Sequence, residues 1–121
     1  MKSSNKKFDL EERTGKFGEE IILLLRNLEK DIVISPVISQ LVRSATSIGA
    51  NYTEANNASS EKDFKNKIFI CKKEVQETKH WMKLVSGYYP TYKLRFEPLA
   101  KEAHEFVLIF QKIITTLKNK H

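Results

Sequence analysis

Glu77 and His80 have a spacing that suggests metal chemistry, because a Glu-x-x-His pair puts a carboxylate and an imidazole one helical turn apart. Helical bundles bind two metal ions with two such motifs and two further carboxylates. The second motif is absent here, since His104 has Lys101 three residues before it. The charge of Lys79 would also repel a cation at this place. We therefore expect no metal and no cofactor.

Nucleophilic catalysis has equally little support in the sequence. Cys71 belongs to an apolar stripe, and a buried cysteine is usually inert. A Cys–His nucleophile would need a histidine close in space. Ser44 and Ser47 lack the context of a nucleophile elbow, and no glycine-rich phosphate loop occurs. We predict that the protein is not an enzyme.

Positive charge suggests a different kind of chemistry. The formal net charge is +6, and most of the excess follows residue 60. Four lysines recur on one flank of a helix predicted over 60–87: Lys65, Lys72, Lys79 and Lys83. Such a row can bind the phosphates of RNA or DNA, although a solvated lysine-rich surface is the simpler alternative.

Three tyrosines follow this helix, namely Tyr88, Tyr89 and Tyr92. Their rings could stack on bases of a bound nucleic acid. Alternatively, they close one end of the protein by packing on neighbouring elements, which is the interpretation that we prefer.

Composition and periodicity predict the elements that position these residues. The chain has 121 residues, 40% hydrophobic and 30% charged, with only 4 Gly and 3 Pro, as is typical of one helical domain. Apolar residues recur every three or four positions in four segments. The predicted helices span about 9–30, 35–57, 60–87 and 94–118, after a frayed tail at 1–7. Four long helices with short connections indicate an all-α, up-down antiparallel four-helix bundle.

Capping residues support these boundaries. Asp9, with Glu12 three residues later, resembles a capping box at the start of the first helix. Ser35 followed by Pro36 is a start signal for the second helix. Ser60 is predicted to cap the third helix.

The second helix has an unusual lack of charge. Between residues 32 and 53 the only charged residue is Arg43, whereas a solvent-exposed helix face normally carries several charges. We therefore expect protein to cover this helix on more than one side, by oligomerisation or by a neighbouring helix of the same bundle. Arg43 is expected to pair with Glu74 or Glu77, within or between subunits. The residues predicted at the oligomer interface or as buried polar groups are Arg43, Ser47, Asn51, Glu54, Glu74, Glu77 and Trp81.

The run Arg43-Ser44-Ala45-Thr46-Ser47-Ile48-Gly49-Ala50-Asn51-Tyr52-Thr53-Glu54-Ala55 resembles the signature of the 23S rRNA intervening sequence proteins. Asp9-Leu10-Glu11-Glu12-Arg13-Thr14 is similar to the opening of that family. Lys62-Asp63-Phe64 and the stretch from Lys73 to Trp81 resemble its third helix.

The resemblance implies a bundle that assembles as a homopentameric ring without catalytic residues. It also implies kinship with the accessory variability protein of diversity-generating retroelements, a basic ring that binds a reverse transcriptase and nucleic acid. The expected function is a non-enzymatic oligomeric scaffold that binds nucleic acid or a ribonucleoprotein through a basic surface. The alternative is a protein-binding adaptor ring without direct nucleic-acid contact. A single cysteine and the absence of a long apolar run predict a cytoplasmic protein with no membrane partner.

Overall fold

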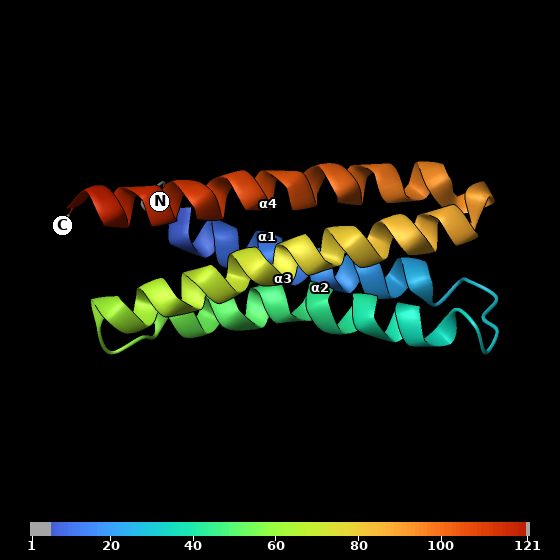
Figure 1. The fold of residues 1–121 in the computed structure, drawn as a ribbon, viewed down its shortest axis with the longest axis horizontal. Helices are drawn as coiled ribbons and strands as arrows, with labels where there is room; N and C mark the ends of the chain where they lie inside the picture. Colours follow the sequence, from blue (N-terminus) through green and yellow to red (C-terminus); the bar gives the residue numbers. More distant parts are fainter. Residues whose placement is uncertain (1–5, 121) are drawn as a thin grey trace.

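The structure is a computed structural model that describes residues 6–120. Within this range it contains no strand, and it has four long helices: α1 (Lys6–Leu25), α2 (Ser35–Asn56), α3 (Glu61–Tyr88) and α4 (Lys93–Lys120). A short 3₁₀ helix, η2 (Pro90–Tyr92), joins α3 to α4. The four helices run up and down along one long axis (Figure 1). No helix in the described range has the length and apolar content needed to span a bilayer.

The start of α1 differs from the sequence prediction. Helix α1 already includes Lys6 and Lys7, so Asp9 lies in its first turn and not at a cap. A carboxylate in this turn still interacts favourably with the positive end of the helix dipole. Of the predicted tail at 1–7, residues 1–5 lie outside the described residues.

Helix α1 also ends at Leu25, about five residues before the predicted boundary. The amides of Asn27 and Leu28 donate to carbonyls three residues back, which is the tightened turn that often ends a helix.

Helix α2 begins at Ser35 as predicted, but the side chain of Ser35 does not cap the helix. Asp31 accepts hydrogen bonds from the amides of Val33 and Ile34 (3.0 and 2.9 Å), while Ser35 donates its hydroxyl to the Asp31 carbonyl. Asp31 therefore organises the entry to α2.

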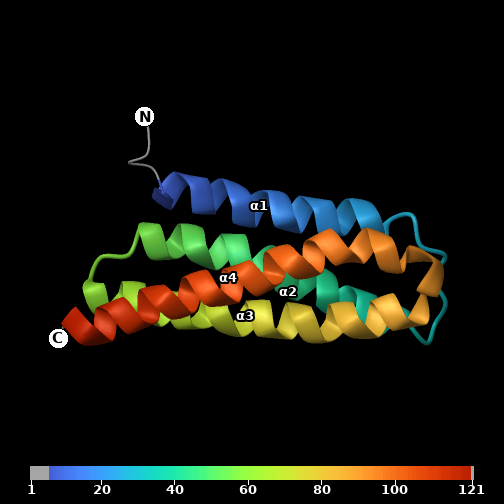
Figure 2. The ribbon, with the colours of Figure 1, turned by 90° about the horizontal axis from the view of Figure 1, so that it is seen from above.

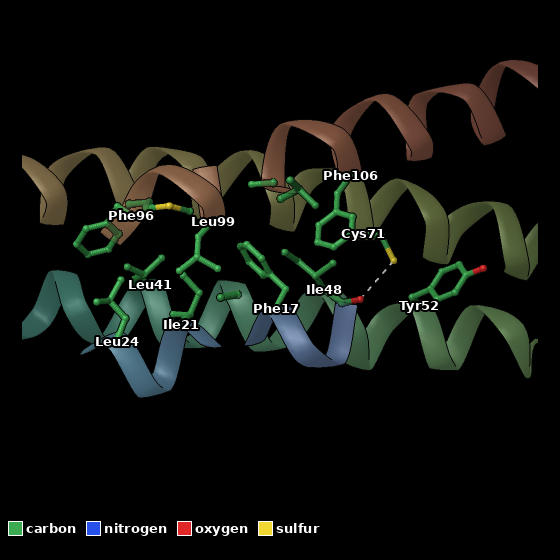
Figure 3. Packing of buried hydrophobic residues seen from close by; sticks show 14 of the residues in the cluster. Phe17, Ile21, Leu24, Leu41, Ile48, Tyr52, Cys71, Phe96, Leu99 and Phe106 are labelled. Atoms are coloured by element: carbon green, nitrogen blue, oxygen red, sulfur yellow. Dashed lines mark hydrogen bonds between the residues drawn. The ribbon is translucent and has the colours of Figure 1, made fainter. Parts of the chain in front are cut away.

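The predicted cap of α3 is confirmed, because Ser60 Oγ accepts from the amide of Asp63 at 3.0 Å. The apolar stripes meet along the axis of the bundle (Figure 3). Phe17 of α1 packs edge-on against Phe106 of α4, with ring centroids 5.5 Å apart. Cys71 of α3 donates weakly to the carbonyl of Ile48 in α2 (3.8 Å). The buried stripe of α4 passes through Ile114, whereas the adjacent Ile113 is half-buried.

Glycines bring α1 and α2 close together. A Cβ atom at Gly49 would lie 3.2 Å from the backbone nitrogen of Gly15, and one at Gly18 would lie 3.4 Å from Cα of Thr46. A side chain at Gly49 would force the backbone of α1 to move by a few tenths of an ångström, whereas a Cβ atom at Gly18 would make an ordinary van der Waals contact. Glycine lowers the helix propensity at these positions, but it allows the backbones of α1 and α2 to approach closely.

Helices α1 and α4 meet much less closely, and they diverge toward the end where the chain begins and finishes (Figure 2). A hollow of about 600 Å³ lies between them and is lined mainly by apolar side chains, including Leu10, Ile109 and Ile113. Arg13 bridges this seam with a two-point hydrogen bond to Glu102 (2.7 and 3.0 Å). The bundle is consequently tight around α2 and α3 and open between α1 and α4.

The three tyrosines close the opposite end of the bundle. Tyr88 donates to the Asp31 carboxylate (2.5 Å), Tyr89 to the carbonyl of Glu29 (2.8 Å), and Tyr92 to that of Asn27 (3.3 Å). The hydrogen bond from Tyr88 is the main reason that the pKa of Asp31 lies below its ordinary value. These contacts tie down the connection that follows α1, in agreement with the interpretation that the tyrosines close the bundle.

Candidate nucleic-acid interface

The four predicted lysines lie on the flank of α3 that faces α4. Lys72 Nζ donates to Gln111 Oε1 of α4 at 2.6 Å, and Lys79 Nζ lies 3.4 Å from Nδ1 of His104. Both lysines are half-buried because their aliphatic stems lie along the α3–α4 seam. Their ammonium groups are therefore held at the surface by an amide and an imidazole, and not by carboxylates.

Lys83 and Lys93 extend this row toward the closed end of the bundle. They border, with Lys79, a shallow hollow of about 230 Å³ whose floor includes Met82 and Phe96. We call the whole surface the lysine face. It consists of Lys65, Lys72, Lys79 and Lys83 of α3 with Lys93, His104 and Gln111 of α4.

Carboxylates border the lysine face only near its two ends. Among residues 6–120, none of the four lysines of α3 in this face forms an ion pair with a carboxylate. Glu61 at one end pairs with Lys120 (3.2 Å), and Glu97 at the other end borders the hollow. A row of like charges without counter-charges concentrates anions, such as a phosphate backbone.

The opposite flank of α3 faces α2 and holds a second charged group, the arginine cluster of Arg43, Glu74 and Glu77. Nη2 of Arg43 lies 2.6 Å from Glu77 Oε1 and 3.2 Å from Glu74 Oε1. The hydrogen bond with Glu74 is the main reason that the pKa of Arg43 is raised above its ordinary value. The predicted ion pair is therefore present, it uses both carboxylates, and it lies within one chain.

The other predicted polar residues of α2 are less buried than expected. Ser47 donates to the carbonyl of Arg43, and Asn51 donates to that of Ser47, so both side chains bond along their own helix. Glu54 pairs with Lys67 (2.7 Å) and not with Arg43. The side chains of Arg43 and Glu54 are 45% and 57% exposed in the single chain, so their place at an interface between subunits stays a prediction. Within the chain, α1 and α3 cover only the inner sides of α2.

Two buried polar atoms remain without a hydrogen bond among the described residues, and both belong to α3. One is the indole nitrogen of Trp81, whose ring packs partly against the core and against His80. The other is Glu74 Oε1, which faces Arg43 at ion-pair distance without hydrogen-bond geometry. A buried polar atom without a partner is costly; the charge of Arg43 offsets this cost for Glu74 Oε1, whereas the indole N–H of Trp81 has no such compensation among the described residues.

Residues considered for catalysis have other roles in the described part of the chain. Glu77 is bound by Arg43, and residues 6–120 contain no group of three potential ligands that could hold a metal ion. Burial raises the pKa of the Cys71 thiol to about 12, so it is not a thiolate at neutral pH.

Sequence reasoning did not assign His104 and Gln111 of α4 to this site. A signal was present, because His104, Gln111 and Lys118 recur every seven residues, as do Lys65, Lys72 and Lys79 on α3. Two seven-residue rows on antiparallel neighbours lie along one seam. Only the register of the two helices shows that Lys72 meets Gln111 and that Lys79 meets His104.

Comparison with known proteins identifies similarity in both sequence and fold. The model of the family described as 23S rRNA-intervening sequence protein matches residues 6–116. A crystal structure of a protein with unknown function from the S23 ribosomal protein family of Bacteroides thetaiotaomicron is 32% identical. The similarity covers 86% of this chain and 96% of that chain, with a TM-score of 0.75. No curated protein matches the chain. Because the family model covers almost the whole sequence, this chain belongs to the 23S rRNA-intervening sequence protein family.

Proposed function

We propose that this protein is a non-enzymatic, oligomeric scaffold of the cytoplasm that binds nucleic acid or a ribonucleoprotein through the lysine face. The observation that carries the proposal is the row of lysines on α3 without carboxylate partners in the described chain. Ion pairing would use these charges inside the protein, whereas neutral partners such as Gln111 leave them available for phosphates. Binding through lysine point charges is expected to depend little on base sequence.

Oligomerisation is supported by the outer surface of α2. Its exposed positions are mostly small and uncharged, including Ser39, Thr46, Ala50 and Thr53. The unpartnered indole of Trp81 lies on the adjacent flank of α3. A second copy packed here would cover the neutral surface, and the resemblance to the family suggests a pentamer. Several copies of the lysine face in one ring would bind a polyanion more tightly than one copy.

The function is tested by fluorescence anisotropy with labelled RNA and DNA over a series of salt concentrations. We expect binding that weakens linearly with the logarithm of salt concentration, by a slope of about −0.7 per phosphate contact on a single strand. Light scattering on the same sample gives the subunit number. Absence of binding to RNA and DNA even at low salt would overturn the proposal.

A protein-binding adaptor ring is the second candidate, and the neutral surface of α2 is the observation that favours it. Uncharged surfaces suit protein contacts better than phosphate contacts. In that case a protein partner would be retained at high salt, while nucleic acid would not bind at all. The two functions therefore differ in their salt dependence.

A further inference from the structure

Phe69 is an unusual residue within the basic part of α3. It is 41% exposed, whereas Phe17, Phe96, Phe106 and Phe110 are each at most 2% exposed. Its ring stacks on no other ring and on no cation among residues 6–120. The face of this phenyl ring is thus available to a ligand.

The surroundings of Phe69 are cationic. On a helix the nearest surface neighbours of a residue lie three and four positions away, and here they are Lys65, Asn66, Lys72 and Lys73. None of the four is a carboxylate. Lys65 and Lys72 lie about 10.5 Å apart along the helix axis, one before and one after the ring. The side chain of Lys73 is 69% exposed and lies only at the limit of pairing with Glu77 (4.0 Å).

The contacts that Lys72 makes with α4 do not involve a carboxylate either. Gln111 accepts from Lys72 through its oxygen and donates through its nitrogen to Thr115 Oγ1 (3.1 Å). The helix neighbours of Phe69 on α3, and the side chains of α4 that Lys72 reaches, therefore carry amides, a hydroxyl and ammonium groups. An exposed phenyl ring in such surroundings gains little from its own protein, but a flat, polarisable base can cover it.

We infer that Phe69 is a stacking platform for an unpaired base, with Lys65 and Lys72 neutralising the phosphates on either side of that base. This inference rests on the proposed function, and it specifies single-stranded nucleic acid as the ligand class. Aromatic rings combined with a positively charged track are the usual means of binding single strands without sequence preference. In a duplex the bases already stack on one another, so a ring on a straight helix reaches only phosphates and sugars.

The test compares Phe69→Ala, Phe69→Trp and wild-type protein in anisotropy titrations with an oligothymidylate of about 20 nucleotides and with a duplex of equal length. We expect Phe69→Ala to weaken single-strand binding about tenfold and duplex binding less than about twofold. Phe69→Trp should bind single strands at least as well as wild type. The slope of affinity against salt should stay unchanged in both variants, because no phosphate contact is lost.

Leu23→Ala is the matched control, since Leu23 is another exposed apolar residue (48%) and lies on α1, which contributes no residue to the lysine face. It should leave both affinities unchanged. Circular dichroism and sizing chromatography on every variant verify the fold and the assembly.

Two outcomes separate this inference from the proposed function. Salt-dependent binding of wild type with no loss in Phe69→Ala would overturn the stacking role and leave nucleic-acid binding intact. A changed elution volume of Phe69→Ala with unchanged binding would place Phe69 between copies of the chain and also overturn it. Failure of wild type to bind either probe would remove the proposed function and this inference together.

Discussion

The flank of α3 that faces α2 and the flank that faces α4 both carry charged side chains, but Lys65, Lys72, Lys79 and Lys83 on the second flank have no carboxylate partner among residues 6–120. On the α2 flank, Arg43 bridges Glu74 and Glu77, and Lys67 bonds Glu54. On the α4 flank, Lys72 contacts the amide of Gln111 and Lys79 contacts the imidazole of His104, and neither partner is a carboxylate. Charges that are matched internally serve packing and specificity. Charges of one sign without internal partners remain available to a ligand.

The largest effect that distinguishes the two flanks is expected from removing the lysines. A variant with Lys65, Lys72, Lys79 and Lys83 changed to Gln should lose about 100-fold in RNA affinity at low salt and flatten the salt slope by about 3. Melting temperature should change little, because the described chain gives these lysines no carboxylate partners.

A matched control separates local charge from net charge. Changing Lys16, Lys30, Lys101 and Lys112 to Gln removes the same charge from other surfaces. We expect a loss of affinity of less than about tenfold. Equal losses in the two quadruple variants would show that the lysine face has no special role.

An intermediate effect is expected on the α2 flank. Arg43→Met leaves Glu74, which is 7% exposed, without its cationic partner, so the free energy of unfolding should fall by about 1–2 kcal/mol. Urea unfolding measures this change, and sizing chromatography shows whether the assembly loosens. RNA affinity per folded chain should be retained.

Lys73→Met is the control for Arg43→Met. Lys73 reaches the same Glu77, but at 4.0 Å and from an exposed position. Its removal should cost less than about 0.5 kcal/mol. If Arg43→Met unfolds and elutes like wild type, the arginine cluster contributes neither to stability nor to assembly.

The smallest expected effect is a change in the alkylation rate of Cys71, which lies in the seam between α2 and α3. Cys71 is buried there, and its pKa of about 12 lies above the ordinary value of 9.0 because burial disfavours the thiolate. The folded state thus favours the protonated thiol, and this contribution to stability is present below pH 9 and declines as the pH rises toward 12. Alkylation at pH 8 should therefore proceed through transient opening of the seam.

Arg43→Met is expected to raise the alkylation rate of Cys71 by a few-fold, because it weakens the contact between α2 and α3. The quadruple lysine variant should alkylate at the wild-type rate. Mass spectrometry over time measures both rates. Faster alkylation in the lysine variant would mean that the α4 flank also holds the bundle together.

Much of this architecture follows from local sequence patterns. The three- and four-residue spacing of apolar side chains predicts all four helices and most of the core, since a helix must bury one face. Ser60 caps α3 as expected, because a cap depends on residues only three positions apart. The Arg43 pair was also predictable, since one charge on a neutral helix needs an acidic partner on its neighbour.

Interactions between distant segments determined the remaining features. Tyr89 and Tyr92 donate to the carbonyls of Glu29 and Asn27, which follow the end of α1 and lie more than fifty residues away in the sequence, so they fix the connection between α1 and α2. Glu54 pairs with Lys67 and not with Arg43, and Lys72 donates to Gln111, because of the register in which the helices pack. Helical periodicity specifies which face each side chain occupies, but not how far one helix slides along its neighbour. That sliding is set by interlocking side chains and by close contacts such as Gly49 against Gly15, which exist only in the folded bundle.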